Sequence, residues 1–139
     1  MSEQSPVHVE GLQASDLFTL IYAKSLDMPQ AEKDTYYKKG NGIFQIDIVH
    51  NGKTHSWTLD LKNKANTFVT LGDAKSQGKK ADVIMAMKDE VFMDLATGKI
   101  NGQKAFLSGK LKLKGNMMLA PKLEAVLKSA QDEVPGAKL

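Results

Sequence analysis

Two histidines, His50 and His55, flank a predicted tight turn and have side chains that could bind a metal ion. In the strand register that the sequence favours, His50 pairs with Lys53 and His55 pairs with Ile48, so the two rings do not face each other. A zinc site needs three or four protein ligands. Neither a cysteine nor a third histidine joins this pair. The sequence therefore predicts two surface histidines and no metal site.

No group of side chains has the spacing of a catalytic site. The glycines of "KKGNGIF" precede a strand, whereas a dinucleotide or phosphate loop needs them after a strand and at the start of a helix. Asp47 and Asp60 fall on the polar side of a predicted hairpin, where we expect them to be solvated. The chain has no cysteine, and no serine lies in a nucleophile elbow. We expect neither a cofactor nor enzyme activity.

Lysines alternate with leucines in "GKLKLKGN" at residues 109–116. A nucleic-acid site would also need aromatic side chains that stack on bases, and none accompanies these lysines. Lysines along an exposed strand also prevent edge-to-edge aggregation, which is the simpler interpretation. The 19 basic and 16 acidic residues are spread over the whole chain, with a net charge of +3. We expect no nucleic-acid partner and only transient contact with anionic membrane surfaces.

The best-defined element is a β-hairpin over residues 42–62. Two alternating runs flank an Asn-Gly dipeptide at residues 51–52, the pair that most favours a type I′ turn. With this loop, Ile46 pairs with Trp57, and the apolar residues of both strands share one face. A shift of one residue would place apolar side chains opposite polar ones, so turn chemistry and face pattern predict the same register.

The remaining elements are predicted from hydrophobic spacing and from capping residues. Residues 72–81 are expected to form a loop without an apolar anchor. Further strands are expected within residues 65–72, at 81–88 inside the sheet, and at 110–114. Helices are expected after a cap at Ser15 and Asp16, over 29–39 and over 88–98, with one or two turns at 101–109.

A proline sets the start of the last helix. Pro121 would remove a hydrogen bond inside a helix but is tolerated in the first turn. We therefore expect residues 116–120 to be irregular and regular helix to begin near Pro121. The order of helices and strands favours an α+β fold with its helices mostly on one face of the sheet.

Length and composition favour one compact domain, since the 139 residues are 42% hydrophobic and 25% charged. No apolar stretch is long enough to span a bilayer, and no secretory signal is expected at the amino terminus. We expect a flexible segment at residues 1–10, the domain at 11–131 and a flexible tail at 132–139. The tail ends in Ala137, Lys138 and Leu139, which differ from the peroxisomal address Ser-Lys-Leu by one hydroxyl group. The sequence thus predicts a peroxisomal location and contact with an import receptor.

Four blocks, "SWTLDLKN", "KKAD", "ATGKINGQKAFLSGKLKLKGNM" and the terminal "AKL", closely resemble the sterol carrier protein type 2 family. The blocks occur in family order and the third is long, so the resemblance is specific over residues 12–139. It implies a five-stranded mixed sheet of order 3-2-1-4-5, covered on one face by helices that enclose a hydrophobic lipid tunnel. It also implies the free-standing form of the family, which is not an enzyme.

The resemblance implies which residues line that tunnel. Gln103 is an expected polar contact, and the apolar positions of the family's cavity region match residues in the strands, the helices and the segment before the last helix. These positions are Trp57, Phe92, Phe106, Met117, Met118 and Leu123. The apolar stripes of neighbouring elements complete the expected lining with Leu17, Phe18, Ile21, Ile46, Leu59, Leu95, Ile100, Leu107 and Leu127.

By this resemblance the protein is expected to carry fatty acids, acyl-coenzyme A esters, sterols and phospholipids in support of peroxisomal lipid metabolism. Helices and sheet would leave the interior unfilled, and a lipid tail would supply the missing contacts. One alternative is a small enzyme, or an enzyme accessory, that acts on acyl-coenzyme A esters. Another is a membrane-surface adaptor that uses its lysines.

Overall fold

A computed structural model describes the backbone of residues 7–62 and 68–132, and the side chains of these ranges up to residue 126. Its centre is a five-stranded sheet of order β3-β2-β1-β4-β5, which confirms the expected strand order. Strand β1 pairs in parallel with β4, and the other pairs are antiparallel. The strands are β1 (Ile43–His50), β2 (Lys53–Asp60), β3 (Val69–Leu71), β4 (Val83–Lys88) and β5 (Leu111–Gly115).

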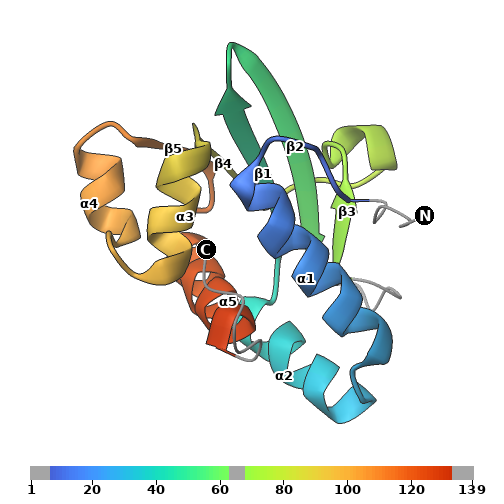
Figure 1. Ribbon diagram of the computed structural model, residues 1–139. Coiled ribbons are helices and arrows are strands. Elements are labelled where there is room, and N and C mark those ends of the chain that lie inside the picture. Colours follow the sequence, from blue (N-terminus) through green and yellow to red (C-terminus); the bar gives the residue numbers. More distant parts are fainter. Residues whose placement is uncertain (1–6, 63–67, 133–139) are drawn as a thin grey trace.

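Helices pack against the sheet, as Figure 1 shows, with α1 crossing in front of it and α4 at the left of the molecule. No helix among the described residues combines the length and the apolar character that a membrane span needs. The helices are α1 (Gln13–Asp27), α2 (Gln30–Gly40), α3 (Asp89–Thr97), α4 (Gly102–Leu107) and α5 (Ala120–Asp132). Two short 3-10 turns are η1 (Lys75–Gln77) and η2 (Met117–Leu119).

The hairpin of β1 and β2 has the predicted register. Asn51 and Gly52 both adopt positive φ values, 52° and 76°, as the predicted type I′ turn requires. Ile46 pairs with Trp57 and Ile48 with His55, so the apolar face is continuous across both strands. This register fixes which side chains of the hairpin point towards the helices.

The start of α1 differs from the prediction. The helix begins at Gln13 rather than after a cap at Ser15 and Asp16, and Ser15 is buried within it. The carboxylate of Asp89 caps the helix instead, accepting hydrogen bonds from the backbone N–H groups of Gln13 (2.8 Å) and Ala14 (2.7 Å). A carboxylate at a helix amino terminus accepts hydrogen bonds from the unpaired backbone N–H groups there and interacts favourably with the helix dipole. Asp89 opens α3, so this cap also ties α3 to α1.

The connection at residues 72–81 is more anchored than expected. It contains η1, and Ala74 is 1% exposed, so the expectation of no apolar anchor is wrong. The segment folds back over the polar side of the hairpin, where the hydroxyl of Thr58 donates to the carbonyl of Gly72 at 2.8 Å. Asp60, expected to be solvated, is buried and forms an ion pair with Lys79 at 2.9 Å.

The entry into α5 agrees with the prediction made from its proline. Residues 117–119 form the 3-10 turn η2, and regular α-helix begins at Ala120, one residue before Pro121. The side chain of Asn116 caps η2 by accepting from the N–H of Met118 at 3.0 Å. Pro121 therefore lies in the first turn, where its missing N–H has no helical partner to lose.

Candidate functional site

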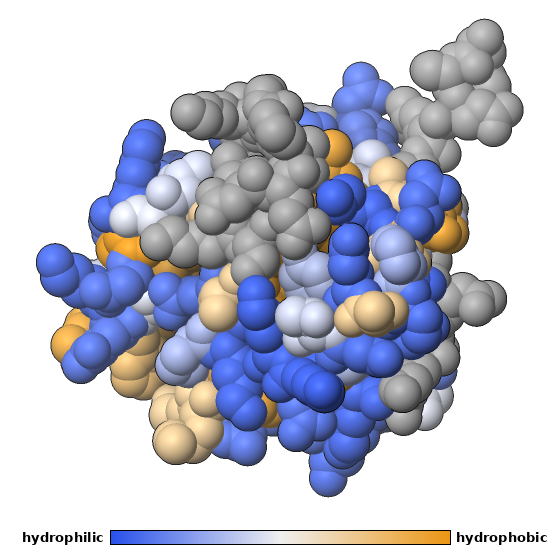
Figure 2. Space-filling view, turned by 90° about the horizontal axis from the view of Figure 1, so that it is seen from below, coloured by the Kyte–Doolittle hydropathy of each residue, from blue (hydrophilic) through white to orange (hydrophobic). Residues whose placement is uncertain are grey.

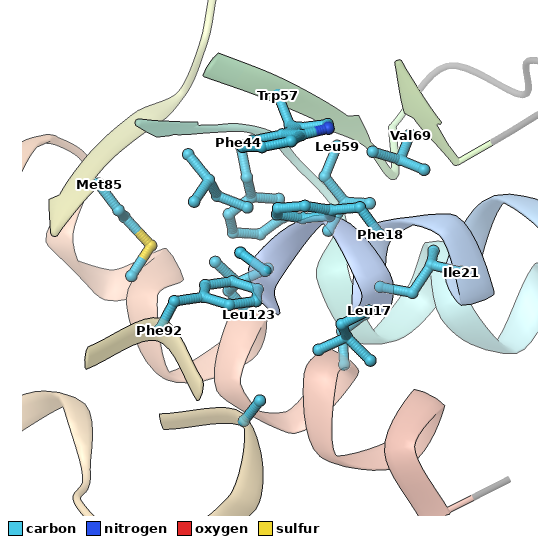
Figure 3. Close-up of a cluster of buried hydrophobic side chains, with 14 of the residues drawn as sticks. Leu17, Phe18, Ile21, Phe44, Trp57, Leu59, Val69, Met85, Phe92 and Leu123 are labelled. Atoms are coloured by element: carbon cyan, nitrogen blue, oxygen red, sulfur yellow. The ribbon is translucent and has the colours of Figure 1, made fainter. Parts of the chain in front are cut away.

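Nine of the sixteen predicted lining residues meet in one buried cluster between the helices and the sheet. Figure 3 shows this cluster, with Phe18 and Leu17 from α1, Trp57 and Leu59 from β2, and Phe92 and Leu123 from α3 and α5. Nine of the predicted residues are at most 3% exposed. These are Leu17, Phe18, Ile21, Ile46, Trp57, Leu59, Phe92, Leu95 and Leu123.

Aromatic rings occupy the centre of this cluster. Phe18 stacks on Trp57 with ring centroids 4.7 Å apart and contacts Phe92 at 5.0 Å. The indole N–H of Trp57 donates to the backbone carbonyl of Val7 at 2.7 Å, so this buried polar group is satisfied. Val7 is itself 1% exposed and belongs to the same cluster. One ring contact thus connects α1 to the sheet, and the other connects α1 to α3.

Five predicted lining residues lie at the surface instead. Gln103 is exposed on α4. Phe106, Leu107, Met117 and Met118 are 41%, 74%, 48% and 79% exposed. Helix α4 has only six residues, and its buried residues are Gly102 and Ala105, so the larger apolar side chains at its end face outwards.

The two remaining residues of the predicted lining are Ile100 and Leu127. Ile100 packs against the edge of the cluster. The side chain of Leu127 and the residues Ala137, Lys138 and Leu139 lie outside the described part of the chain.

The buried cluster also contains residues outside the predicted lining. Phe44 is fully buried beside Leu59, its partner in the hairpin register, and the strand alternation was sufficient to find it. Met28, Met85, Met87 and Met93 are also buried, at 9%, 2%, 3% and 5% exposure. Unbranched methionine side chains adapt to irregular spaces better than branched ones do.

A second aromatic group closes the cluster at the α2 side. Tyr36 and Tyr37 contact the ring of Phe68 at 5.4 Å and 5.5 Å. Burial, with smaller contributions from the negative charges of Asp60 and Asp34, raises the pKa of Tyr37 above its usual value. This shift further disfavours the phenolate, the charged form of Tyr37.

Polar groups that could do chemistry are not brought together. Within the described residues, no three His, Cys, Asp or Glu side chains are grouped to hold a metal ion. The cluster described above consists of apolar and aromatic side chains, with the satisfied indole N–H of Trp57 at its centre and the phenols of Tyr36 and Tyr37 at the α2 side. Such a surface can hold hydrocarbon through burial and van der Waals contact.

Comparison with known proteins identifies similar chains. The model of the SCP-2 sterol transfer family matches residues 22–128. The oleate-induced peroxisomal protein POX18 of Candida maltosa is 42% identical over 123 residues, which cover 88% of this chain and 92% of that protein. A fatty acid-binding protein of Yarrowia lipolytica is 39% identical over 128 residues, covering 91% and 97% of the two chains.

Solved structures also match. Sterol Carrier Protein 2 from Yarrowia lipolytica, in its apo form, superposes with a TM-score of 0.78 at 38% sequence identity. The match covers 92% of this chain and 99% of that one.

Proposed function

The chain belongs to the SCP-2 sterol transfer family, and from that premise we propose that it binds and transfers lipids. The acyl chain of the lipid occupies the apolar interior between α1, α3, α5 and the sheet. The ligands are fatty acids and their coenzyme A esters, with sterols and phospholipids as further guests. The protein acts as a carrier and not as an enzyme.

The observation that carries this proposal is the continuous apolar cluster between helices and sheet. The names of the two sequence relatives support it, because one is called a fatty acid-binding protein and the other is oleate-induced and peroxisomal. A guest chain has to separate side chains that now touch, such as Phe18 and Phe92. The buried methionines make this repacking less costly than a core of branched side chains would.

The expected affinity follows from hydrocarbon burial. About sixteen methylene groups at roughly 0.8 kcal/mol each give a gross gain of about 13 kcal/mol. Losses of chain freedom and association entropy leave about 7–10 kcal/mol, which is micromolar to sub-micromolar binding. One methylene more or less changes this by only about 1–3 kcal/mol, so we expect poor discrimination between neighbouring chain lengths.

Titration with fatty acids and with a fluorescent acyl probe tests the proposal. Trp57 is the single tryptophan, is fully buried and stacks on Phe18, so it reports directly on the interior. We expect a saturable change in its emission, and displacement of the probe by oleate and by a sterol. If several acyl and sterol probes fail to bind to protein shown to be folded, the carrier function is rejected.

The enzyme alternative is decided in the same samples. A carrier should return acyl-coenzyme A esters unchanged after prolonged incubation. Product formation that persists through rigorous purification would favour the enzyme.

We further propose that the chain is peroxisomal and is recognised by an import receptor through Ala137, Lys138 and Leu139. The peroxisomal names of relatives support this location. A fluorescent protein fused to the amino terminus should co-localise with a peroxisomal marker, and removal of the last three residues should disperse it. Unchanged peroxisomal fluorescence after this deletion would show that the tripeptide is not the address.

We also propose that the protein contacts membranes through an exposed apolar patch when it takes up or releases a lipid. The proposed surface, called the α4–η2 patch, combines the exposed apolar residues of two elements, Phe106 and Leu107 of α4 and Met117 and Met118 of η2. Figure 2 shows apolar surface at the left edge of the molecule, the side on which α4 lies in Figure 1. The lysines of α4 and β5, Lys104, Lys112 and Lys114, are exposed near these elements and suit an anionic lipid surface.

A further inference from the structure

A surface groove of about 510 Å³ lies where β4 ends and α3 begins. The connection from α4 to β5, with Ser108, Gly109 and Lys110, forms its third side. Its volume falls within the range of about 300–1,000 Å³ that is usual for sites of small organic ligands. A single carboxylate would occupy only a small part of it.

Three lysines line this groove, namely Lys88, Lys110 and Lys112. Strand pairing brings them together, because Met87 pairs with Leu111, so that the next residues along the two strands are Lys88 and Lys110. Lys112 follows two residues later and points to the same side of β5 as Lys110. In the part of the chain that the structure describes, none of the three forms an ion pair.

Neighbouring like charges repel each other, and a bound anion relieves this repulsion. Glu90 and Asp94 also line the groove, and both belong to α3, one helical turn apart. The three lysines therefore come from β4, from β5 and from the residue before β5, whereas both acidic residues come from α3. An anionic ligand would lie against the strands rather than against the helix.

The floor of the groove is continuous with the buried interior. Met87 and Val91 line the groove, yet they are only 3% and 6% exposed and belong to the central apolar cluster. Met87 and Val91 therefore belong both to the lining of the groove and to the central cluster, and the methionine side chain is flexible. A ligand with its charged end in the groove can pass its tail between these side chains into the interior.

We propose that the groove holds the phosphate-bearing headgroup of an acyl-coenzyme A ester, while its acyl chain enters the interior past Met87 and Val91. The inference rests on the proposed lipid-binding function. Several phosphates match three closely placed lysines better than the single charge of a fatty acid does. The volume of the groove, about 510 Å³, likewise favours a headgroup of nucleotide size.

A paired charge reversal tests the headgroup site. In the double variant Lys110→Glu/Lys112→Glu, we expect the affinity for palmitoyl-coenzyme A to fall about tenfold or more, because two attractive contacts become repulsive. The affinity for palmitate should change by less than about threefold, since it carries one charge. The matched control Lys75→Glu/Lys80→Glu makes the same charge change at exposed residues before β4, outside the groove. It should bind both ligands like the parent protein.

The outcomes separate this inference from the proposed function. Failure of the parent protein to bind either ligand contradicts the proposed function itself. If the parent protein binds both ligands, two results would overturn the headgroup site alone. One is an unchanged affinity of the groove variant for palmitoyl-coenzyme A, and the other is an equal loss of this affinity in the control. Circular dichroism of all variants, whose substituted lysines are exposed, shows that the fold is retained. The loss in the groove variant should shrink at high salt, because screening weakens phosphate contacts.

Discussion

Replacing Phe92 by alanine is expected to lower the free energy of unfolding of the lipid-free protein by about 3–5 kcal/mol. Phe92 is fully buried, and its ring contacts Phe18 at 5.0 Å, so truncation removes apolar burial and leaves a cavity at the centre of the cluster. Domains of this size are stable by about 5–15 kcal/mol, so the variant should still be largely folded. Urea unfolding followed by circular dichroism measures the difference.

Phe106→Ala is the matched control, because it removes the same side chain from a position that is 41% exposed. Its effect should stay below about 1 kcal/mol, because the side chain of Phe106 buries less apolar surface on folding and its removal leaves a smaller cavity. Equal effects of the two substitutions would mean that the centre of the cluster is not tightly packed in the lipid-free protein.

Introducing aspartate at both Leu107 and Met118 should reduce binding to anionic vesicles by about 100-fold or more. Each substitution removes about 1 kcal/mol of apolar insertion and adds about 1 kcal/mol of repulsion from the negative surface. The sum of about 4 kcal/mol corresponds to more than two factors of ten. Co-sedimentation with vesicles rich in phosphatidylserine measures the effect, together with the rate of lipid transfer between vesicles.

The control for the α4–η2 patch places aspartate at Leu26 and Leu71. These residues are 55% and 42% exposed, on α1 and β3, and the net charge changes equally. Vesicle binding lowered to the same extent in both double variants would contradict a membrane surface at α4 and η2. A loss of fatty-acid binding in solution would instead assign Leu107 and Met118 to the lipid site, as the sequence analysis expected.

Local chemistry predicted the local structure well. The Asn-Gly turn and the alternation of the two strands both determine the hairpin register, and the structure has that register. Gly98 ends α3 in a left-handed conformation, as its position after the apolar stripe predicts. The start of α5 follows from Pro121, because the pyrrolidine ring restricts only the residues before it. In each case the determining residues lie close together in the sequence.

Contacts between distant residues were not predictable in the same way. The carboxylate that caps α1 comes from Asp89, 75 residues after Ala14, and a capping pattern within the helix itself pointed to Ser15 instead. The parallel pairing of β1 with β4 also joins distant residues, such as Phe44 and Val83, and the strand order was expected from the family resemblance alone. Long-range pairing depends on the whole fold rather than on neighbouring residues.

In the candidate site, too, burial was predictable for residues of long elements and not for residues of short ones. Side chains on long elements with clear periodicity, such as Phe18 on α1 and Trp57 on β2, lie in the interior as expected. Phe106 and Met118 come from elements of six and three residues, which are too short for spacing to show a buried face. Asp60 was expected in water because its strand face is polar, yet the 72–81 connection covers it.

The central claim is that the tail of a bound lipid lies inside the cluster between helices and sheet. Isotope-filtered nuclear Overhauser spectroscopy of the labelled protein with unlabelled palmitate tests it directly. We predict contacts from the methylene protons of palmitate to the rings of Phe18 and Phe92 and to the methyl groups of Leu123. Saturable palmitate binding with contacts confined to surface residues such as Leu107 and Met118 would contradict it.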